Sequence, residues 1–246
     1  VGSEMCIRDR FKMTKYFIYI MLFVSIFSCS KKIEIDENKV FKLNRYDNIS
    51  SLDPINARTQ ANNWACNLMY NSLVKIDNEL EIQPDIAKFW TISEDGKTYS
   101  FTLRNDVFFH KHEAFGKDST RIVTASDFEY SFNRLKDPKA GGSGGWIMNN
   151  INSYKAINDT LFEIKLKEAY PAFLGLISMK YASVVPKELF KNGNDEFLKH
   201  PIGTGPFQFK IWEDNVKMVF RKNPNYFEFD EKGQRLSLIH ISEPTR

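Results

Sequence analysis

Residues 84–110, PDIAKFWTISEDGKTYSFTLRNDVFFH, carry the clearest fold signal in the sequence. Within them, residues 98–104 alternate apolar Tyr, Phe and Leu with Thr and Ser, which is typical of a strand with one buried face. The Asp-Gly pair in 94–97 indicates a tight hairpin turn, so a partner strand is expected over 90–93. Because residues 84–89 are expected to form a short helix, the stretch predicts a β-hairpin that follows a helix.

Segments on both sides of this hairpin predict a chain in which helices and strands mix. Residues 61–73 carry apolar side chains at helical spacing, and residues 125–135 do so after a capping box that begins at Thr124. Further strands are expected over 40–45, 151–158, 160–166, 206–211 and 216–221, and short helices over 171–177 and 187–191. Because strands and helices mix irregularly and no repeat is visible, the elements fit an α/β or an α+β fold.

Length and composition exclude several classes of protein. The chain has 246 residues, of which 42% are hydrophobic and 14% aromatic, so it can bury a sizeable core and is not a disordered polar chain. Its net charge of +3 is too small to predict a nucleic-acid partner, which would need clustered Lys and Arg.

The two ends of the sequence, residues 1–12 and 236–246, are expected to be foreign to the protein. VGSEMCIRDR and LSLIHISEPTR resemble translated sequencing adapters, so the native chain is expected to begin at Met13 and to continue past Arg235. Leaving out both ends removes four basic and three acidic residues and lowers the net charge from +3 to +2, which leaves the conclusion about nucleic acid unchanged.

The segment after Met13 has the pattern of a secretory signal. Residues 16–27 form an apolar run of twelve, which is short of the ~20 residues that a membrane-spanning helix needs. Ser28-Cys29 at its end resembles the bacterial lipobox, which implies a signal peptide over 13–28, lipidation of Cys29 and a polar tether over 29–39. The alternatives are a stray cysteine in an ordinary signal or a buried helix.

Motifs for catalysis or metal binding are weak. His110 and His112, with Glu113, could begin a zinc site, but no further His or Cys ligands are apparent, so a turn residue and an exposed one are the favoured interpretation. A G-x-S-x-G elbow is absent. Cys66 lies in an apolar helical pattern and is expected to be a core residue. No catalytic residue, metal site or cofactor is predicted.

Three groups of motifs, in this order along the chain, resemble the family 5 extracellular solute-binding proteins, which are the oligopeptide, dipeptide and nickel binders of ABC importers. They are LDP at 52–54 with LMYNSLVKID at 68–77, the stretch 84–110 running on to SDFEYSFNRLKDP at 126–138, and PIGTGPFQF at 201–209 with RKNPNYF at 221–227. The departures are Lys-His-Glu at 111–113, where the family usually has Asp-Gly-Glu, and an insertion around 115–120.

This resemblance implies an α/β fold of the periplasmic-binding-protein type II kind, with mixed sheets and flanking helices. Since the family is roughly twice this long, the chain is expected to be the N-terminal part of a two-lobed fold and to be incomplete. The implied domains are the first lobe in two parts, 40–73 and 182–235, with an inserted subdomain over 74–181 between them. The opposing lobe would then be missing.

The implied function is that of a lipid-anchored binding protein, not an enzyme, on the periplasmic face of a bacterial membrane or at the cell surface. It would capture a peptide or a related small solute between two lobes and deliver it to an ABC permease. The loops expected to face the cleft are 46–51, the helix start at 62–64 and 203–205, and the expected ligand contacts are Tyr46, Asn62 and Trp64. Two alternatives stay open: a solute-sensing or scavenging lipoprotein without an importer, and a periplasmic hydrolase.

Overall fold

The computed structural model of the chain describes residues 47–140, 142–190, 197, 198, 200–214, 216–230, 233 and 235. All of them belong to one compact unit, Arg45–Arg246. The predictions for the signal peptide, Cys29, the tether, the strand over 40–45, Tyr46 and residues 236–246 lie outside this part of the chain. Within it, no helix is both long enough and apolar enough to cross a membrane.

A four-stranded antiparallel sheet contains the predicted hairpin. Its strand order is β3 (Ala87–Ile92), β4 (Thr98–Leu103), β6 (Leu161–Leu166) and β5 (Ile151–Asn158). Alternate residues of β4 and β6 are buried on one face, namely Tyr99, Phe101, Leu103, Phe162, Ile164 and Leu166. The period-2 pattern of the sequence therefore predicted these two strands correctly, because each one has a single buried face.

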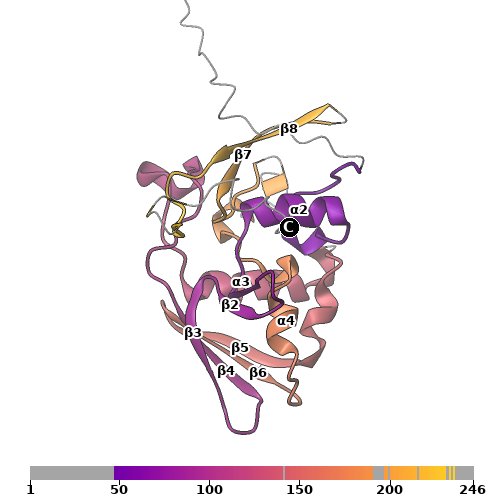
Figure 1. Cartoon of the computed structure of the whole chain (residues 1–246), viewed down its shortest axis with the longest axis vertical. Helices are drawn as coiled ribbons and strands as arrows, with labels where there is room; N and C mark the ends of the chain where they lie inside the picture. Colours follow the sequence, from indigo (N-terminus) through magenta and orange to yellow (C-terminus); the bar gives the residue numbers. More distant parts are fainter. Residues whose placement is uncertain are drawn as a thin grey trace, which may run out of the picture. The chain divides into compact units, whose positions relative to one another are not determined.

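Helix α3 (Ala125–Lys136) packs on the buried face of this sheet (Figure 1). The ring centroids of Phe128 and Phe132 lie 5.9 and 5.5 Å from that of Phe162 on β6. The capping box is confirmed, since the backbone N–H of Thr124 donates to Oδ2 of Asp127 at 2.9 Å. The cap thus fixes where the helix begins. The two phenylalanines of the helix, four residues apart, fix which face of the helix meets the sheet.

Helix α2 (Gln60–Met69) is shorter than the predicted helix over 61–73, because Tyr70 is extended. The prediction of a helix over 84–89 is wrong. Pro84 ends β2 (Ile82–Pro84), which pairs with β1 (Val74–Ile76), residues 85 and 86 form a bend, and residues 87–89 begin β3. Both differences have one cause. Backbone N–H groups of residues 85–87 donate to the carbonyls of Ser72 and Leu73, so the two segments hold each other extended.

The remaining elements are short. A β-hairpin, β7 (Phe207–Glu213) and β8 (Lys217–Lys222), agrees with the prediction for 206–221, and α4 (Phe173–Ile177) lies within the helix predicted over 171–177. Residues 187–190 form a 3₁₀ turn where a helix was predicted over 187–191. That turn is η7 (Lys187–Phe190), and the other 3₁₀ turns are η2 (Pro54–Asn56), η3 (Glu113–Asp118), η4 (Pro138–Ala140), η5 (Gly145–Asn150) and η6 (Lys180–Ala182).

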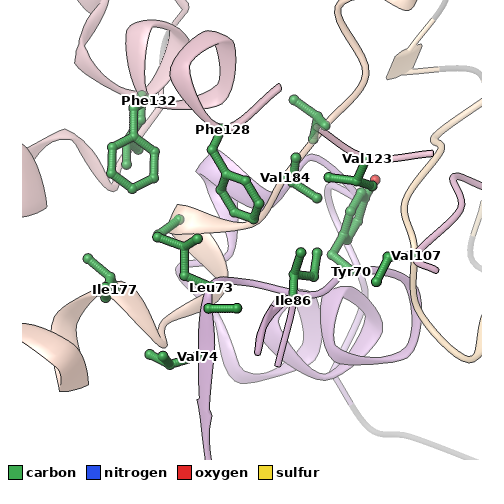
Figure 2. Close-up of a cluster of buried hydrophobic side chains, with 14 of the residues drawn as sticks. Tyr70, Leu73, Val74, Ile86, Val107, Val123, Phe128, Phe132, Ile177 and Val184 are labelled. Carbon is green, nitrogen blue, oxygen red and sulfur yellow. The ribbon is translucent and has the colours of Figure 1, made fainter. Parts of the chain in front are cut away.

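The hydrophobic core joins these elements. Figure 2 shows Tyr70, Leu73 and Ile86 lying among Phe128 of α3, Ile177 of α4 and side chains from segments that are far apart in the sequence. The connection between α2 and β1 therefore runs through the centre of the core. This core fixes the end of α2 and, with it, the loop that precedes the helix.

Candidate functional site

The loop 47–53, which precedes α2, is exposed at its start and anchored at its end. Residues 47 and 48 are exposed, whereas Leu52 and Asp53 are buried. The carbonyl of Leu52 accepts a hydrogen bond from the hydroxyl of Tyr70 at 2.9 Å. The loop thus has exposed residues at its start, while its end is held in the core.

Asn62 holds the same loop from the first turn of α2. Its Oδ1 accepts from the backbone N–H of Ser50 at 2.9 Å, and its Nδ2 donates to Oγ of Ser50 at 3.1 Å and to the carbonyl of Asn56 at 3.2 Å. The side chain is buried, with 3% of the residue exposed. Asn62 therefore lies at the predicted loop, and its amide is engaged in holding that loop.

Trp64, the other described residue of the predicted site, is half-buried and packs against the hydrophobic core. A ligand contact by Asn62 or Trp64 stays a prediction.

Sequence reasoning missed a buried ion pair beneath the loop. The guanidinium of Arg134 on α3 makes two parallel hydrogen bonds to the carboxylate of Asp53, one of them at 2.8 Å from Nη1 to Oδ1 and the other from Nη2 to Oδ2. Oδ1 of Asp53 also accepts from the N–H of Ile55 at 3.2 Å, which caps η2. The available signal was a single arginine between two buried apolar residues, Phe132 and Leu135, on the inner face of a predicted helix.

The loop 203–205, expected to face the cleft, is buried instead. Its backbone N–H at Gly205 donates to the carbonyl of Met69 at 2.8 Å, and Oγ1 of Thr204 donates to Oδ1 of Asn71 at 3.0 Å. A Cβ atom at Gly203 would lie 2.0 Å from the Met69 oxygen. The close backbone path expected of these glycines is confirmed, and it places the loop against the end of α2.

His110 also holds the loop 203–205, through hydrogen bonds to Gly203 and Gly205. Its backbone N–H donates to the carbonyl of Gly203 at 2.8 Å, while its Nδ1 accepts from the N–H of Gly203 at 3.3 Å. Nε2 lies 2.9 Å from the carbonyl of Gly205 and therefore carries the proton. Burial lowers the pKa of His110 to about 4. The expected turn residue is thus a buried, neutral imidazole.

Two further groups near the end of α2, the buried Asp85 and the half-buried Lys180, serve structure. Burial raises the pKa of Asp85, whose carboxylate accepts from Nδ2 of Asn71 at 2.8 Å and from the N–H of Ser72 at 2.9 Å. Burial lowers the pKa of Lys180, whose Nζ donates to the carbonyl of Tyr70 at 3.2 Å. Groups with shifted pKa values often mark catalytic sites. Here Asp85 binds a side-chain amide and a backbone N–H, Lys180 binds a backbone carbonyl, and the two charges attract each other, so both groups connect segments of the core.

The chemistry of a nucleophile or a metal centre is not assembled in the described part of the chain. Cys66 is fully buried, which confirms that it is a core residue, and burial raises the pKa of its thiol to about 12. No group of three His, Cys, Asp or Glu side chains comes together among the residues described. An open hollow of about 390 Å³ lies along β7, and it is lined by Leu198, His200, Phe209, Lys210, Ile211, Trp212 and Asp214.

Comparison with known proteins gives this geometry its context. Residues 81–246 match the family model of the bacterial extracellular solute-binding proteins, family 5 middle. The chain belongs to this family. It is 32% identical over 176 residues to the dipeptide-binding protein of Escherichia coli and 30% identical over 200 residues to the nickel-binding periplasmic protein of the same organism. These matches cover 65% and 80% of the chain but 32% and 36% of the relatives, so the family 5 chain spans about a third of their length.

Solved structures agree with this assignment. The periplasmic binding protein DppA of Helicobacter pylori, in complex with the peptide STSA, superposes with a TM-score of 0.67 at 30% identity over 74% of the chain and 38% of that protein. NikZ of Campylobacter jejuni, in complex with Ni(L-His), gives 0.64 at 30% identity over 74% and 35%. The predicted family and the predicted type II periplasmic-binding-protein fold, present here in part, are confirmed.

Proposed function

We propose that this family 5 chain is the N-terminal part of a substrate-binding lipoprotein that captures a peptide or a related small solute and delivers it to an ABC permease. The observation that carries the proposal is the exposed loop 47–51, whose position is fixed by Asn62 and by the buried Leu52 and Asp53. A loop that is held in one position and exposes residues 47, 48 and 50 suits recognition of a peptide main chain, which leaves the ligand's side chains free to vary.

The proposed division of the chain is a first lobe over 40–73 and 182–235, with an inserted subdomain over 74–181. Hydrogen bonds between the two parts of that lobe support it. The N–H of Val184 donates to the carbonyl of Asn71 at 3.1 Å, and that of Gly205 donates to the carbonyl of Met69 at 2.8 Å. In this proposal the chain supplies one wall of the cleft, with Tyr46, Asn62 and Trp64 on it, and residues beyond Arg235 supply the other. Sequencing the locus past the codon for Arg235 should reveal a continued reading frame, followed by permease and ATPase genes; an immediate stop codon would contradict the proposal.

We expect the full-length product of that locus to be stabilised by short peptides. A ligand that binds only the folded state at 100 times its Kd adds about 2.7 kcal/mol to the free energy of unfolding. Thermal unfolding should be recorded with trialanine, with tetraalanine and with Ni(II) plus L-histidine, each against buffer. A rise of the melting temperature with the peptides alone supports a peptide ligand, and a rise with the nickel complex alone shifts the solute class. Unchanged melting temperatures in all three would refute solute binding of these kinds.

Membrane attachment is expected to depend on Cys29. The variant Cys29→Ala lacks the thiol that would carry the lipid, so the protein should move from the membrane fraction to the soluble fraction of the expressing cells. The matched control is Cys66→Ala, which removes a buried thiol and should leave the protein in the membrane fraction. If the Cys29→Ala protein stays with the membranes, the proposed lipidation is wrong.

A further inference from the structure

Two helices hold the loop 47–53 from different parts of the chain. Asn62 on α2 binds it at Ser50, and Arg134 on α3 binds it at Asp53, 81 residues away in sequence. Under the proposed division, α2 belongs to the first lobe and α3 to the inserted subdomain. The position of the loop, which belongs to the first lobe, is therefore tied to α3, a helix of the inserted subdomain.

The contact between Arg134 and Asp53 fixes the relative orientation of the guanidinium and the carboxylate. Both residues are buried, with 5% and 2% of their side chains exposed, and the guanidinium binds the carboxylate through two nitrogens. The guanidinium carbon lies 4.4 Å from the ring centroid of Phe190 and 5.6 Å from that of Phe197, so two aromatic rings pack against the guanidinium. Among the described residues, Nε of Arg134 is buried and has no hydrogen-bond partner, and a lysine could not reproduce the fork.

The pair acts on the backbone that leads to the exposed part of the loop. Asp53 follows Leu52, whose carbonyl is bound by the Tyr70 hydroxyl, and the N–H of Asp53 donates to Oγ of Ser51 at 3.1 Å. A displacement of Asp53 would therefore reach Ser51 and Ser50 through one or two residues. Asn62 and the Tyr70 hydroxyl would then hold the loop without the ion pair.

We propose that Arg134 is a positioning residue for ligand binding, because it fixes loop 47–53 through its paired hydrogen bonds to Asp53. It touches no ligand itself, and the inference rests on the proposed function. Buried pairs of this kind add little net stability compared with apolar packing, so a role in fixing geometry accounts better for its presence here. The inserted subdomain thus takes part in binding by holding a loop of the first lobe in place.

Arg134→Lys is the main test variant, because it keeps the charge that Asp53 needs and removes the two-nitrogen fork. Arg104→Lys is the control, since Arg104 also binds an aspartate, Asp106, through two nitrogens and packs against the ring of Phe227, with 4.9 Å between the guanidinium carbon and the ring centroid; this pair is more exposed than the pair of Arg134 and Asp53. The double variant Asp53→Asn, Arg134→Gln removes both charges together, so that no unpaired charge is buried if the lysine variant does not fold.

Two readouts are needed, both on the full-length protein. Hydrogen exchange of the backbone amides in 47–55 should become faster in Arg134→Lys, as in Asn62→Ala, and should be unchanged in Arg104→Lys. The ligand is the probe that raises the wild-type melting temperature, either trialanine or Ni(II) with L-histidine. Its Kd should rise roughly tenfold in Arg134→Lys and stay within twofold of the wild-type value in Arg104→Lys.

The outcomes separate the claims. Unchanged exchange in 47–55 would overturn the inference, and so would faster exchange with an unchanged Kd, since Arg134 would then be merely structural. A lower melting temperature with an unchanged Kd would lead to the same conclusion. If the wild-type protein binds neither probe, the proposed function fails, while the exchange rates still decide whether Arg134 positions the loop.

Discussion

The variant Gly203→Ala is expected to destabilise the protein by about 3 kcal/mol, because there is no room for a single added methyl group. The new Cβ would lie 2.0 Å from the carbonyl oxygen of Met69 and 2.6 Å from Cδ1 of Tyr70. That same oxygen accepts the N–H of Gly205 at 2.8 Å, so any movement that relieves the clash breaks this hydrogen bond. The free energy of unfolding, measured by urea titration of the full-length protein, should fall accordingly.

Gly175→Ala is the matched control. It adds the same methyl group in α4, where no heavy atom lies within 4 Å of the new Cβ, and alanine is the better helix former. The control should leave the free energy of unfolding unchanged or raise it by up to about 1 kcal/mol. Equal stability of Gly203→Ala and the wild type would mean that the loop 203–205 does not pack against the end of α2 in solution.

The buried His110 is expected to make the stability of the protein depend on pH below neutrality. Its pKa is about 4 in the folded protein, compared with 6.5 for a free imidazole, because burial disfavours the charged ring. Between these two values the unfolded chain takes up a proton that the folded chain does not. The contribution of the neutral His110 to the free energy of unfolding is therefore fully present above pH ~6.5. As the pH falls toward 4, about 3 kcal/mol of this free energy is lost.

The contacts of His110 explain why protonation is resisted. Nδ1 accepts from the N–H of Gly203, and a second proton there would place two donors against each other. In His110→Gln the side chain keeps a donor toward the Gly205 carbonyl but cannot titrate. The variant should be less stable than the wild type at pH 7.5, and its free energy of unfolding should fall less steeply between pH 6.5 and 4.

His112→Gln is the control for this effect, since His112 is half-buried and its ring nitrogen Nδ1 accepts only from a neighbouring N–H, that of Ala114 at 3.1 Å. Urea titrations at several pH values should show the wild-type slope in this control. A His110→Gln protein with the wild-type slope would show that His110 is not the group responsible.

Much of the fold follows from local patterns. The strand over 98–104, the turn before it and the capping box at Thr124 were predicted correctly, because each depends on residues within a few positions of one another. The family resemblance was also visible, since its motifs are short and keep their order along the chain. Local patterns failed at 84–89, where the sequence favours a helix and the structure has strands.

Sequence by itself therefore determined the hairpin, the capped helix α3 and the family of this protein. Only the tertiary structure decided which residues lie together at the candidate site. Residues 85–87 bind the carbonyls of Ser72 and Leu73, where a helix was expected, and Asp53 of loop 47–53 pairs with Arg134, 81 residues away in sequence. Such contacts leave no periodic trace in the sequence, because hydrogen bonds and ion pairs between distant segments depend on where the hydrophobic core brings the segments together.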